Sequence, residues 1–176
     1  MHMNQIDIKG KYWDQLITAT GEVVDYGWRS NIIVNQCRQL LAAFMKGETA
    51  SGIQRIALGR GEEVWDVESP PSPEMTTDRL VDPSPQIITT GAPEMELEFL
   101  NGAGEVSSTV SQSIQITINI AAGSLPIAVG EDSFPLREFG LFADLAADEF
   151  MIDYVRHPVM NIGPEDTLVR RVRLFF

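Results

Sequence analysis

Apolar and polar residues alternate with a period of two in several parts of this chain, and this pattern constrains its fold more than any other feature. The clearest case is Ile114–Ile120, where four isoleucines alternate with Gln, Thr and Asn. Successive side chains of a strand point to opposite faces, so this run predicts a strand buried on one face. Residues 94–99 alternate in the same way, with Glu on one face. A turn sequence, Asn-Gly-Ala-Gly at 101–104, follows, so we expect the two strands to pair as an antiparallel hairpin.

Six further segments are expected to be strands. They are Lys11–Ile17, Glu22–Trp28, Gly52–Gly59, Leu136–Phe142, Phe150–Val155 and Leu168–Phe176. The first two flank Thr-Ala-Thr-Gly, a turn sequence that predicts a second hairpin. Strands outnumber helices and no strand–helix–strand alternation is present. We therefore expect a mainly β fold, an antiparallel β-sandwich-like structure with one packed α-helix, in a single domain over 1–176.

One segment, Ile33–Lys46, has the periodicity of a helix. Its apolar residues recur at spacings of three and four, which predicts one apolar stripe that packs against the sheet. They are Ile33, Val34, Cys37, Leu40, Leu41, Phe44 and Met45. Asn31 is the expected N-cap, because its side chain can accept from free amides of the first turn. Gly47 is expected to end the helix in the left-handed conformation.

Residues 62–86 differ in composition from the rest of the chain. They hold five of the ten prolines and seven carboxylates. Proline has no amide to give to a sheet and disfavours helix at the preceding residue, so we expect an extended, acidic, Pro-rich arm. Trp65, Leu80 and Val81 are its apolar anchors. Large apolar residues commonly anchor interfaces, and these three are candidates for contact with a neighbouring subunit.

The charge of the chain is strongly negative, with 25 Asp and Glu against 13 Lys and Arg and a net charge of −12. This balance argues against nucleic acid as a partner, because phosphate binding needs positive surface. Arg170, Arg171 and Arg173 nevertheless gather in the last strand, which ends with Phe175 and Phe176. The arginines either pair with carboxylates of their own chain or with the acidic surface of a neighbouring subunit. All five residues are candidates for a subunit interface.

Residues for catalysis, metal binding or cofactor binding do not form a recognisable set in the sequence. Cys37, the one cysteine, lies on the apolar stripe, where it is expected to be a buried small hydrophobe. His157 beside Pro158 is expected to be a strand-end residue, because no zinc ligand set can be completed. Gly59-Arg60-Gly61 lacks the remaining residues of a nucleotide loop and predicts a turn. We therefore expect no enzymatic activity, no metal and no cofactor.

Two features bear on location. No run of 18 apolar residues is present, so no membrane span is expected. The first seven residues lack a positive start followed by an apolar core, so no secretion signal is expected and the protein is interpreted as made in the cytoplasm.

Four segments resemble structural proteins of the tails of tailed bacteriophages. Trp28–Gln36, which contains Asn-Ile-Ile-Val-Asn, leads into the helix, and Ile53–Gly61 ends in Leu-Gly-Arg-Gly. This order is similar to tail proteins in which such a segment and a short helix precede a strand ending in Leu-Gly-x-Gly. Leu136–Phe142 and Tyr154–Pro158 are similar to a Leu-x-Glu-hydrophobic-Gly-Leu-aromatic strand and a proline strand end of tail-fibre and baseplate proteins.

The resemblance implies a structural, non-enzymatic component of a phage tail or of a related contractile particle. It implies synthesis in a bacterial cytoplasm, a place in the virion tail, assembly as a homo-oligomer such as a trimer or hexameric ring, and attachment to other tail proteins. Two alternatives are a carbohydrate- or ligand-binding β module and a hydrolase. The first would use Trp13, Trp28 and Trp65 as stacking platforms, and the second would use acidic residues such as Asp66 and Glu138.

Overall fold

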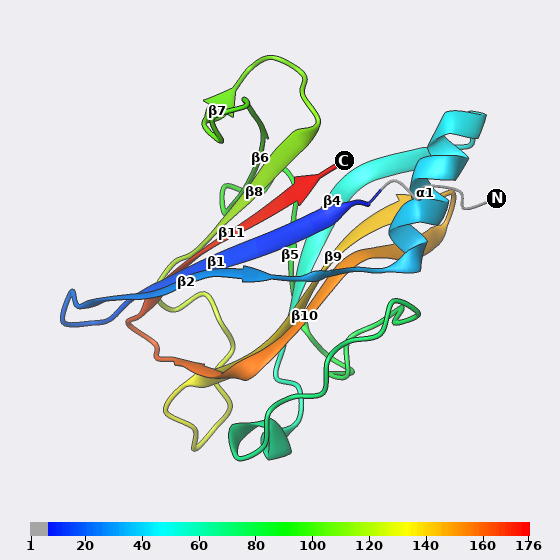
Figure 1. The fold of residues 1–176 in the computed structure, drawn as a ribbon. Coiled ribbons are helices and arrows are strands. Elements are labelled where there is room, and N and C mark those ends of the chain that lie inside the picture. Colours follow the sequence, from blue (N-terminus) through cyan, green and yellow to red (C-terminus); the bar gives the residue numbers. More distant parts are fainter. Residues whose placement is uncertain (1–6) are drawn as a thin grey trace.

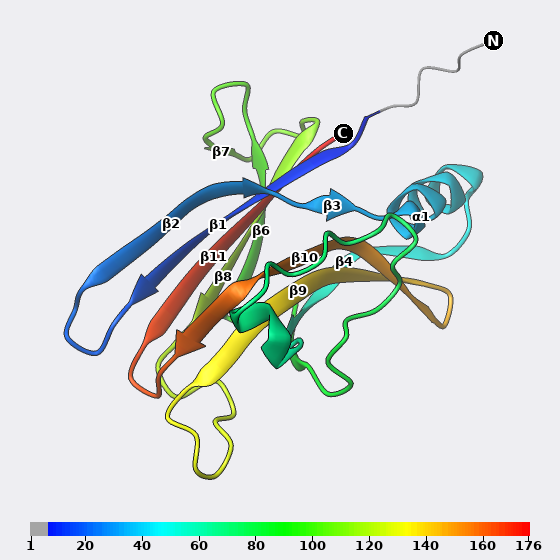
Figure 2. The ribbon, with the colours of Figure 1, turned by 60° about the horizontal axis from the view of Figure 1, so that its bottom comes forward.

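Two antiparallel β-sheets pack face to face in the computed structural model, which describes residues 7–176 (Figures 1 and 2). Strands make up 50% of the chain and helical residues 9%. The fold is therefore mainly β and sandwich-like, with one α-helix, as the alternating pattern predicts. Residues 1–6, on which the expectation of no secretion signal largely rests, lie outside the described residues.

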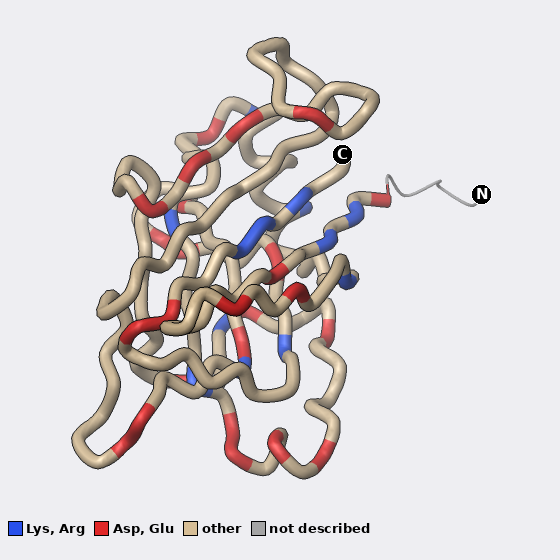
Figure 3. The backbone as a smooth tube through the Cα atoms, turned by 90° about the vertical axis from the view of Figure 1, so that its left-hand side faces the viewer, with Lys and Arg blue, Asp and Glu red and all other residues tan. Residues whose placement is uncertain are grey.

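The first sheet has six strands in the order β2-β1-β11-β8-β6-β7. Their bounds are β1 Lys9–Ile17, β2 Val23–Ser30, β6 Met95–Leu100, β7 Val106–Ser107, β8 Ser113–Ile120 and β11 Thr167–Phe175. Both predicted hairpin pairings are present, β1 with β2 and β6 with β8. The connection in the second hairpin is longer than expected, because it contains the short strand β7, which pairs with the other side of β6 at the edge of the sheet. Lys and Arg positions gather on β1 and β11 in the middle of this sheet (Figure 3).

The second sheet has five strands in the order β3-β10-β9-β4-β5. Their bounds are β3 Ile32–Ile33, β4 Ala50–Gly59, β5 Gln86–Thr89, β9 Phe134–Leu145 and β10 Asp148–Ile162. The pair β9 and β10 is longer than the sequence segments that predicted it. Every strand pairing in this sheet is antiparallel.

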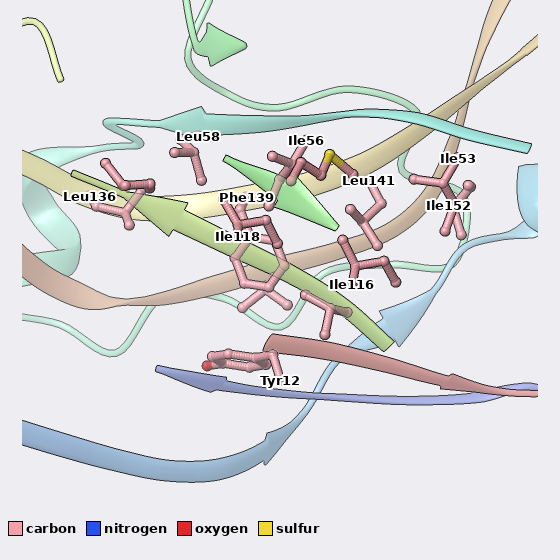
Figure 4. Close-up of a cluster of buried hydrophobic side chains, with 14 of the residues drawn as sticks. Tyr12, Ile53, Ile56, Leu58, Ile116, Ile118, Leu136, Phe139, Leu141 and Ile152 are labelled. Atoms are coloured by element: carbon pink, nitrogen blue, oxygen red, sulfur yellow. The ribbon is translucent and has the colours of Figure 1, made fainter. Parts of the chain in front are cut away.

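The inner faces of the two sheets enclose the main hydrophobic core (Figure 4). Ile116 and Ile118 of β8, both fully buried, face Phe139 and Leu141 of β9 across this space. The Tyr12 ring of β1 meets the Phe139 ring edge to face, with 5.3 Å between ring centroids. Burial of side chains of this size stabilises a fold by about 1.5–3 kcal/mol each. The alternation of β8 thus places its isoleucines where the sequence predicts.

The outer face of the five-stranded sheet is covered by residues 62–86, which pass in front of β9 and β10 (Figure 2). This segment contains a short 3-10 helix, η1 Glu63–Asp66, and otherwise has no helix or strand until β5. A second, smaller hydrophobic cluster fills the space beneath it. Its members are Val34, Ala57, Leu80, Phe142, Met151 and Tyr154. The five-stranded sheet is therefore buried on both faces.

The helix α1 spans Asn35–Lys46 and lies at one end of the sandwich, near the C-terminus (Figure 1). It begins two residues later than predicted, because Ile32–Ile33 pair with β10 as strand β3. The prediction that Asn31 caps the helix is wrong, since its side-chain amide donates to Asp153 instead. Gly47 ends the helix in the left-handed conformation, with φ of 86°, as predicted.

The apolar stripe of α1 is buried only in part. Cys37 and Leu40 face the sandwich, whereas Phe44 is 64% exposed and Met45 is 83% exposed. The expectation that the whole stripe packs against the sheet is therefore wrong. Because the helix lies at the end of the sandwich and meets mainly β10 and β4, its last turn extends beyond the sheets.

Leu40 and Phe44, one turn apart on α1, should differ sharply in their effect on stability. Leu40→Ala should lower the free energy of unfolding by about 2–5 kcal/mol, because it removes buried side-chain volume. Phe44→Ala should change it by less than about 0.5 kcal/mol, because the ring is largely in solvent. Urea denaturation followed by circular dichroism measures both, and equal losses for the two variants would contradict the observed helix orientation.

Candidate subunit interface

Strand β11 divides the interface candidates of the C-terminal segment between its two faces. Arg170 points into the sandwich on the same face as Val172, and both are buried. Arg171, Arg173 and Phe175 lie on the outer face of the six-stranded sheet and are half-buried. The period of two thus gives three neighbouring arginines two different environments.

Arg170 belongs to the interior of its own chain. Its side chain is fully buried, and its Nε and Nη2 donate to the two carboxylate oxygens of Asp14 at 2.6 and 2.8 Å. Its guanidinium also lies over the Phe139 ring, 4.0 Å from the centroid. The expectation that Arg170 contacts a neighbouring subunit is therefore corrected, because its charge is compensated and inaccessible.

His157 completes this buried polar group. Its Nδ1 donates to the Pro158 carbonyl at 2.7 Å, which leaves Nε2 as the acceptor for Arg170 Nη2 at 3.3 Å. Burial and the charge of Arg170 lower the pKa of His157 to about 4. The ring is thus neutral near pH 7 and serves as a hydrogen-bond acceptor between β10 and β11, which belong to different sheets.

Trp65 and Leu80 are also buried in their own chain, with 4% and 7% of their surfaces exposed. The Trp65 ring lies against Gly61, where an added Cβ would come within 2.5 Å of it, and beneath the guanidinium of Arg156 at 5.3 Å. The expectation that these two side chains are anchors for a neighbour is corrected by this placement. Val81, 38% exposed, is the anchor of the arm that stays accessible.

Glu138 fixes the arm to the five-stranded sheet. Its fully buried carboxylate accepts the amides of Val81 at 3.0 Å and Asp82 at 2.7 Å, and also the hydroxyl of Tyr154. Gly59 gives this carboxylate its space, because a Cβ there would lie 2.6 Å from the Glu138 side chain. Glu138 therefore has a structural role, with its oxygens occupied by donors of the protein.

Asp66, the other acidic residue considered for a hydrolase, is likewise occupied. Arg137 donates to both of its carboxylate oxygens, at 2.6 and 2.7 Å. The hydrogen bonds from Arg137 lower the pKa of Asp66, and the positive charge of Arg137 lowers it further. The Asp66 carboxylate thus holds η1 against β9.

The outer face of the six-stranded sheet carries three cations stacked on two indoles. Arg171 lies over the Trp13 ring at 4.8 Å, and Arg173 lies over the Trp28 ring at 4.6 Å. Lys11 also lies over Trp28, at 4.7 Å. The indoles themselves are neighbours, with 6.5 Å between ring centroids. We call these five residues the cation–indole face.

The cations of this face have no carboxylate partner in the part of the chain that the structure describes. Seven of the thirteen Lys and Arg form ion pairs among residues 7–176. Lys11, Arg171 and Arg173 are among the other six. In a chain with almost twice as many carboxylates as cations, this concentration of uncompensated positive charge marks a surface suited to an acidic partner.

The same cations disfavour the carbohydrate-binding alternative. A sugar ring stacks on the open face of an indole, whereas cations already lie over Trp13 and Trp28. Trp65, the third expected platform, is buried. The arrangement fits contact with charged groups better than stacking of sugars.

An open apolar groove lies at the end of the sandwich where β11 ends, between α1 and the inner faces of the two sheets. Its volume is about 320 Å³. Its walls include Leu40, Leu41, Phe44, Leu97, Leu174 and Phe176. Phe176 lies on the groove while the preceding Phe175 lies on the outer face of the sheet, so the end of the chain joins the two surfaces. Exposed apolar surface of this kind commonly marks a contact site.

Cys37, at this groove, has no features of a reactive thiol. Burial raises its pKa to about 11, so the thiolate is scarce at neutral pH. Within residues 7–176 no group of three His, Cys, Asp or Glu side chains is placed to hold a metal ion. In the same range, no helix is long and apolar enough to cross a membrane.

Comparisons with protein-family models, with curated proteins and with solved structures found no match to this chain.

Sequence reasoning identified Arg171, Arg173, Phe175 and Phe176 but missed Lys11 on the neighbouring strand. The alternation of β1 already places Lys11 and Trp13 together on the face opposite the buried Tyr12. What it does not reveal is that β1 pairs with β11, a strand far away in the sequence, so that Lys11 lies opposite Arg173 and Trp13 lies opposite Arg171. Long-range pairing alone brings these side chains together.

Removal of the Arg170 charge should strongly destabilise the fold. Arg170→Leu should lower the free energy of unfolding by about 3–5 kcal/mol, because Asp14 would be left as an uncompensated buried charge. The double change Asp14→Leu/Arg170→Leu should cost less than the single change. Urea denaturation measures this, with Arg171→Leu as the control on the outer face. A single-variant loss similar to that of the control would contradict the buried pair.

Asp153 should make stability fall as the pH rises from about 4 to about 7. Burial raises its pKa to about 7, against about 3.9 when unfolded, so the native state favours the protonated carboxyl. The contribution of this group is full below pH 4 and is lost as pH approaches 7, a change of about 4 kcal/mol at most. Relative to wild type, Asp153→Asn should therefore become progressively more stable across this range, as measured by urea denaturation at each pH.

The depressed pKa of His157 acts in the opposite direction, since its contribution is present above pH 6.5 and lost toward pH 4. Comparison of Asp153→Asn with wild type cancels this term, because both proteins keep His157. A difference between the two proteins that stays constant from pH 4 to pH 7 would contradict the raised pKa.

Proposed function

We propose that this protein is a structural component of a phage tail or of a related contractile particle. It acts through contacts between subunits, as a homo-oligomer and with other tail proteins, rather than through catalysis. The observation that carries this proposal is that the cation–indole face and the apolar groove, on opposite faces of the six-stranded sheet, both reach the C-terminal end of β11. One surface supplies uncompensated charge and the other supplies exposed apolar area, the two components of a protein–protein interface.

The segments that resemble tail proteins support the proposal in a second way. They include residues of β3, β4, β9 and β10, which are neighbours in the five-stranded sheet, and the first segment also holds the end of β2 and the start of α1. Gly59 of one segment makes space for Glu138 of another, and Tyr154 of a third donates to the same carboxylate. The resembling residues thus build one structural unit, whose strand β4 also forms part of the wall of the groove.

The location in a particle can be tested directly. Particles are induced from the bacterium that carries the gene, purified by density gradient and examined by immunogold electron microscopy. We expect labelling on tails and not on heads. A chain that is abundant in the lysate but absent from the purified particles would contradict the proposal.

Variants with fewer apolar side chains at the groove should fold normally but be incorporated less into particles. Phe44→Ser/Met45→Ser removes exposed apolar area from the rim of the groove and the end of α1, and should leave the free energy of unfolding within about 0.5 kcal/mol of wild type. The amount of variant chain per purified particle should fall clearly below that of wild type, as measured by quantitative mass spectrometry.

The matched control for this variant is Val67→Ser/Val129→Ser, which removes exposed apolar side chains far from the groove in sequence and outside its walls. It should be incorporated like wild type. Equal incorporation of both double variants would show that the end of α1 takes no part in assembly.

A further inference from the structure

The outer face of the six-stranded sheet has a basic half and an acidic half. The basic half is the cation–indole face on β2, β1 and β11. The acidic half is β6, near the other edge of the sheet, where Glu96 and Glu98 point outward. The strand β8 separates the two halves with the uncharged Thr117 and Gln115, of which Gln115 is buried and accepts from Arg173 Nε at 2.9 Å.

The strand register aligns the two halves row by row. Arg171 is opposite Thr117, and Thr117 is opposite Glu96. In the next row Arg173 is opposite Gln115, and Gln115 is opposite Glu98. Cation and carboxylate positions in each row are two strand spacings apart, about 10 Å. Each row therefore has a positive end and a negative end.

Neither half is neutralised by the described residues of its own chain. Among residues 7–176, no ion pair includes Lys11, Arg171, Arg173, Glu96 or Glu98. Arg171 lies over Trp13, on the side away from β6. Burial and the nearby charge of Arg171 lower the pKa of Arg173, which is the direction expected for cations held together without a counter-charge.

We infer that this face binds a second copy of the same chain, with the basic half of one copy against the acidic strand β6 of the other. The inference rests on the proposed function, because it specifies one of the subunit contacts. A second copy supplies both charges that the face lacks. Reciprocal contact of two copies would satisfy both halves at once, and head-to-tail contact would satisfy them in a ring.

A second copy explains the face better than an unrelated polyanion does. A polyanion would neutralise the basic half but leave Glu96 and Glu98 without a partner, and the net charge of −12 would oppose its approach. A second copy carries the same net charge, yet it can align opposite charges at close range, where they outweigh the screened long-range repulsion. Trp28, 41% exposed, and Phe175 add apolar area at the same contact.

Charge exchange between two variants tests this inference. Arg171→Glu/Arg173→Glu makes both halves acidic, and Glu96→Arg/Glu98→Arg makes both halves basic. Each variant alone should self-associate at least about a hundredfold more weakly than wild type, because like charges would then face each other. Mixed together in equal amounts, the two variants should associate with each other, and the chain with all four changes should self-associate again. Sedimentation equilibrium measures each dissociation constant.

Two control variants change the net charge equally without touching this face. Lys46→Glu/Arg79→Glu matches the first variant, and Glu22→Arg/Glu165→Arg matches the second; all four side chains are exposed. Both controls should self-associate more nearly like wild type than the face variants do. Circular dichroism of every variant shows whether the monomer is folded, and the mixed sample does so independently, because misfolded chains would not regain association.

Three results would overturn the inference. They are a wild-type chain that stays monomeric at all concentrations, a Glu96→Arg/Glu98→Arg variant that self-associates like wild type, and variants that fail to associate when mixed. The particle experiment separates these from the proposed function. If the chain is found in tails but the charge-exchange variants fail to associate, the proposed function stands and this contact is wrong. If the variants associate but no chain is found in tails, the contact stands and the proposed function is wrong.

Discussion

Hydrogen bonds to the buried carboxylate of Glu138 hold the cover on the outer face of the five-stranded sheet in place. It binds the amides of Val81 and Asp82 and the hydroxyl of Tyr154, and so joins the arm to β9 and β10. The arm in turn covers Phe142 and Tyr154, which would otherwise be exposed on the outer face. A buried charge of this kind is costly unless donors satisfy it, and here they come from a segment that has almost no helix or strand of its own.

Charge has opposite roles on the two faces of the six-stranded sheet. Inside, Arg170 and Asp14 neutralise each other and His157 accepts a further hydrogen bond from Arg170 Nη2, so these contacts join β1, β11 and β10 within the core. Outside, Arg171 and Arg173 rest on indoles and stay uncompensated. Adjacent residues of one strand therefore have different roles: Arg170 stabilises the monomer, whereas Arg171 and Arg173 form the surface that we propose contacts a second copy. The outer surface costs little in the monomer because the guanidinium groups keep contact with water.

The sequence predicted the eight longer strands but not the short strands β3, β5 and β7, and it predicted the helix only in part. Alternation in residues 114–120 identifies a strand whatever lies around it, because the period follows from backbone geometry. The stripe of α1 identifies a helix in the same way, but burial of Phe44 depends on how far the sheets extend beneath it. Asn31 failed as a cap for a related reason, since Asp153, distant in sequence, is the partner that its amide reaches.

The sequence by itself determined the mainly β fold, the place of the single helix and the division of Arg170, Arg171 and Arg173 between two faces. These properties depend on periods of 2 and 3.6 residues, which short segments carry without reference to the rest of the chain. Only the tertiary structure decided which face is inside, and with it the burial of Arg170 and Trp65 and the alignment of basic and acidic rows. Those properties arise from strand pairings between distant segments, whose register no local pattern encodes.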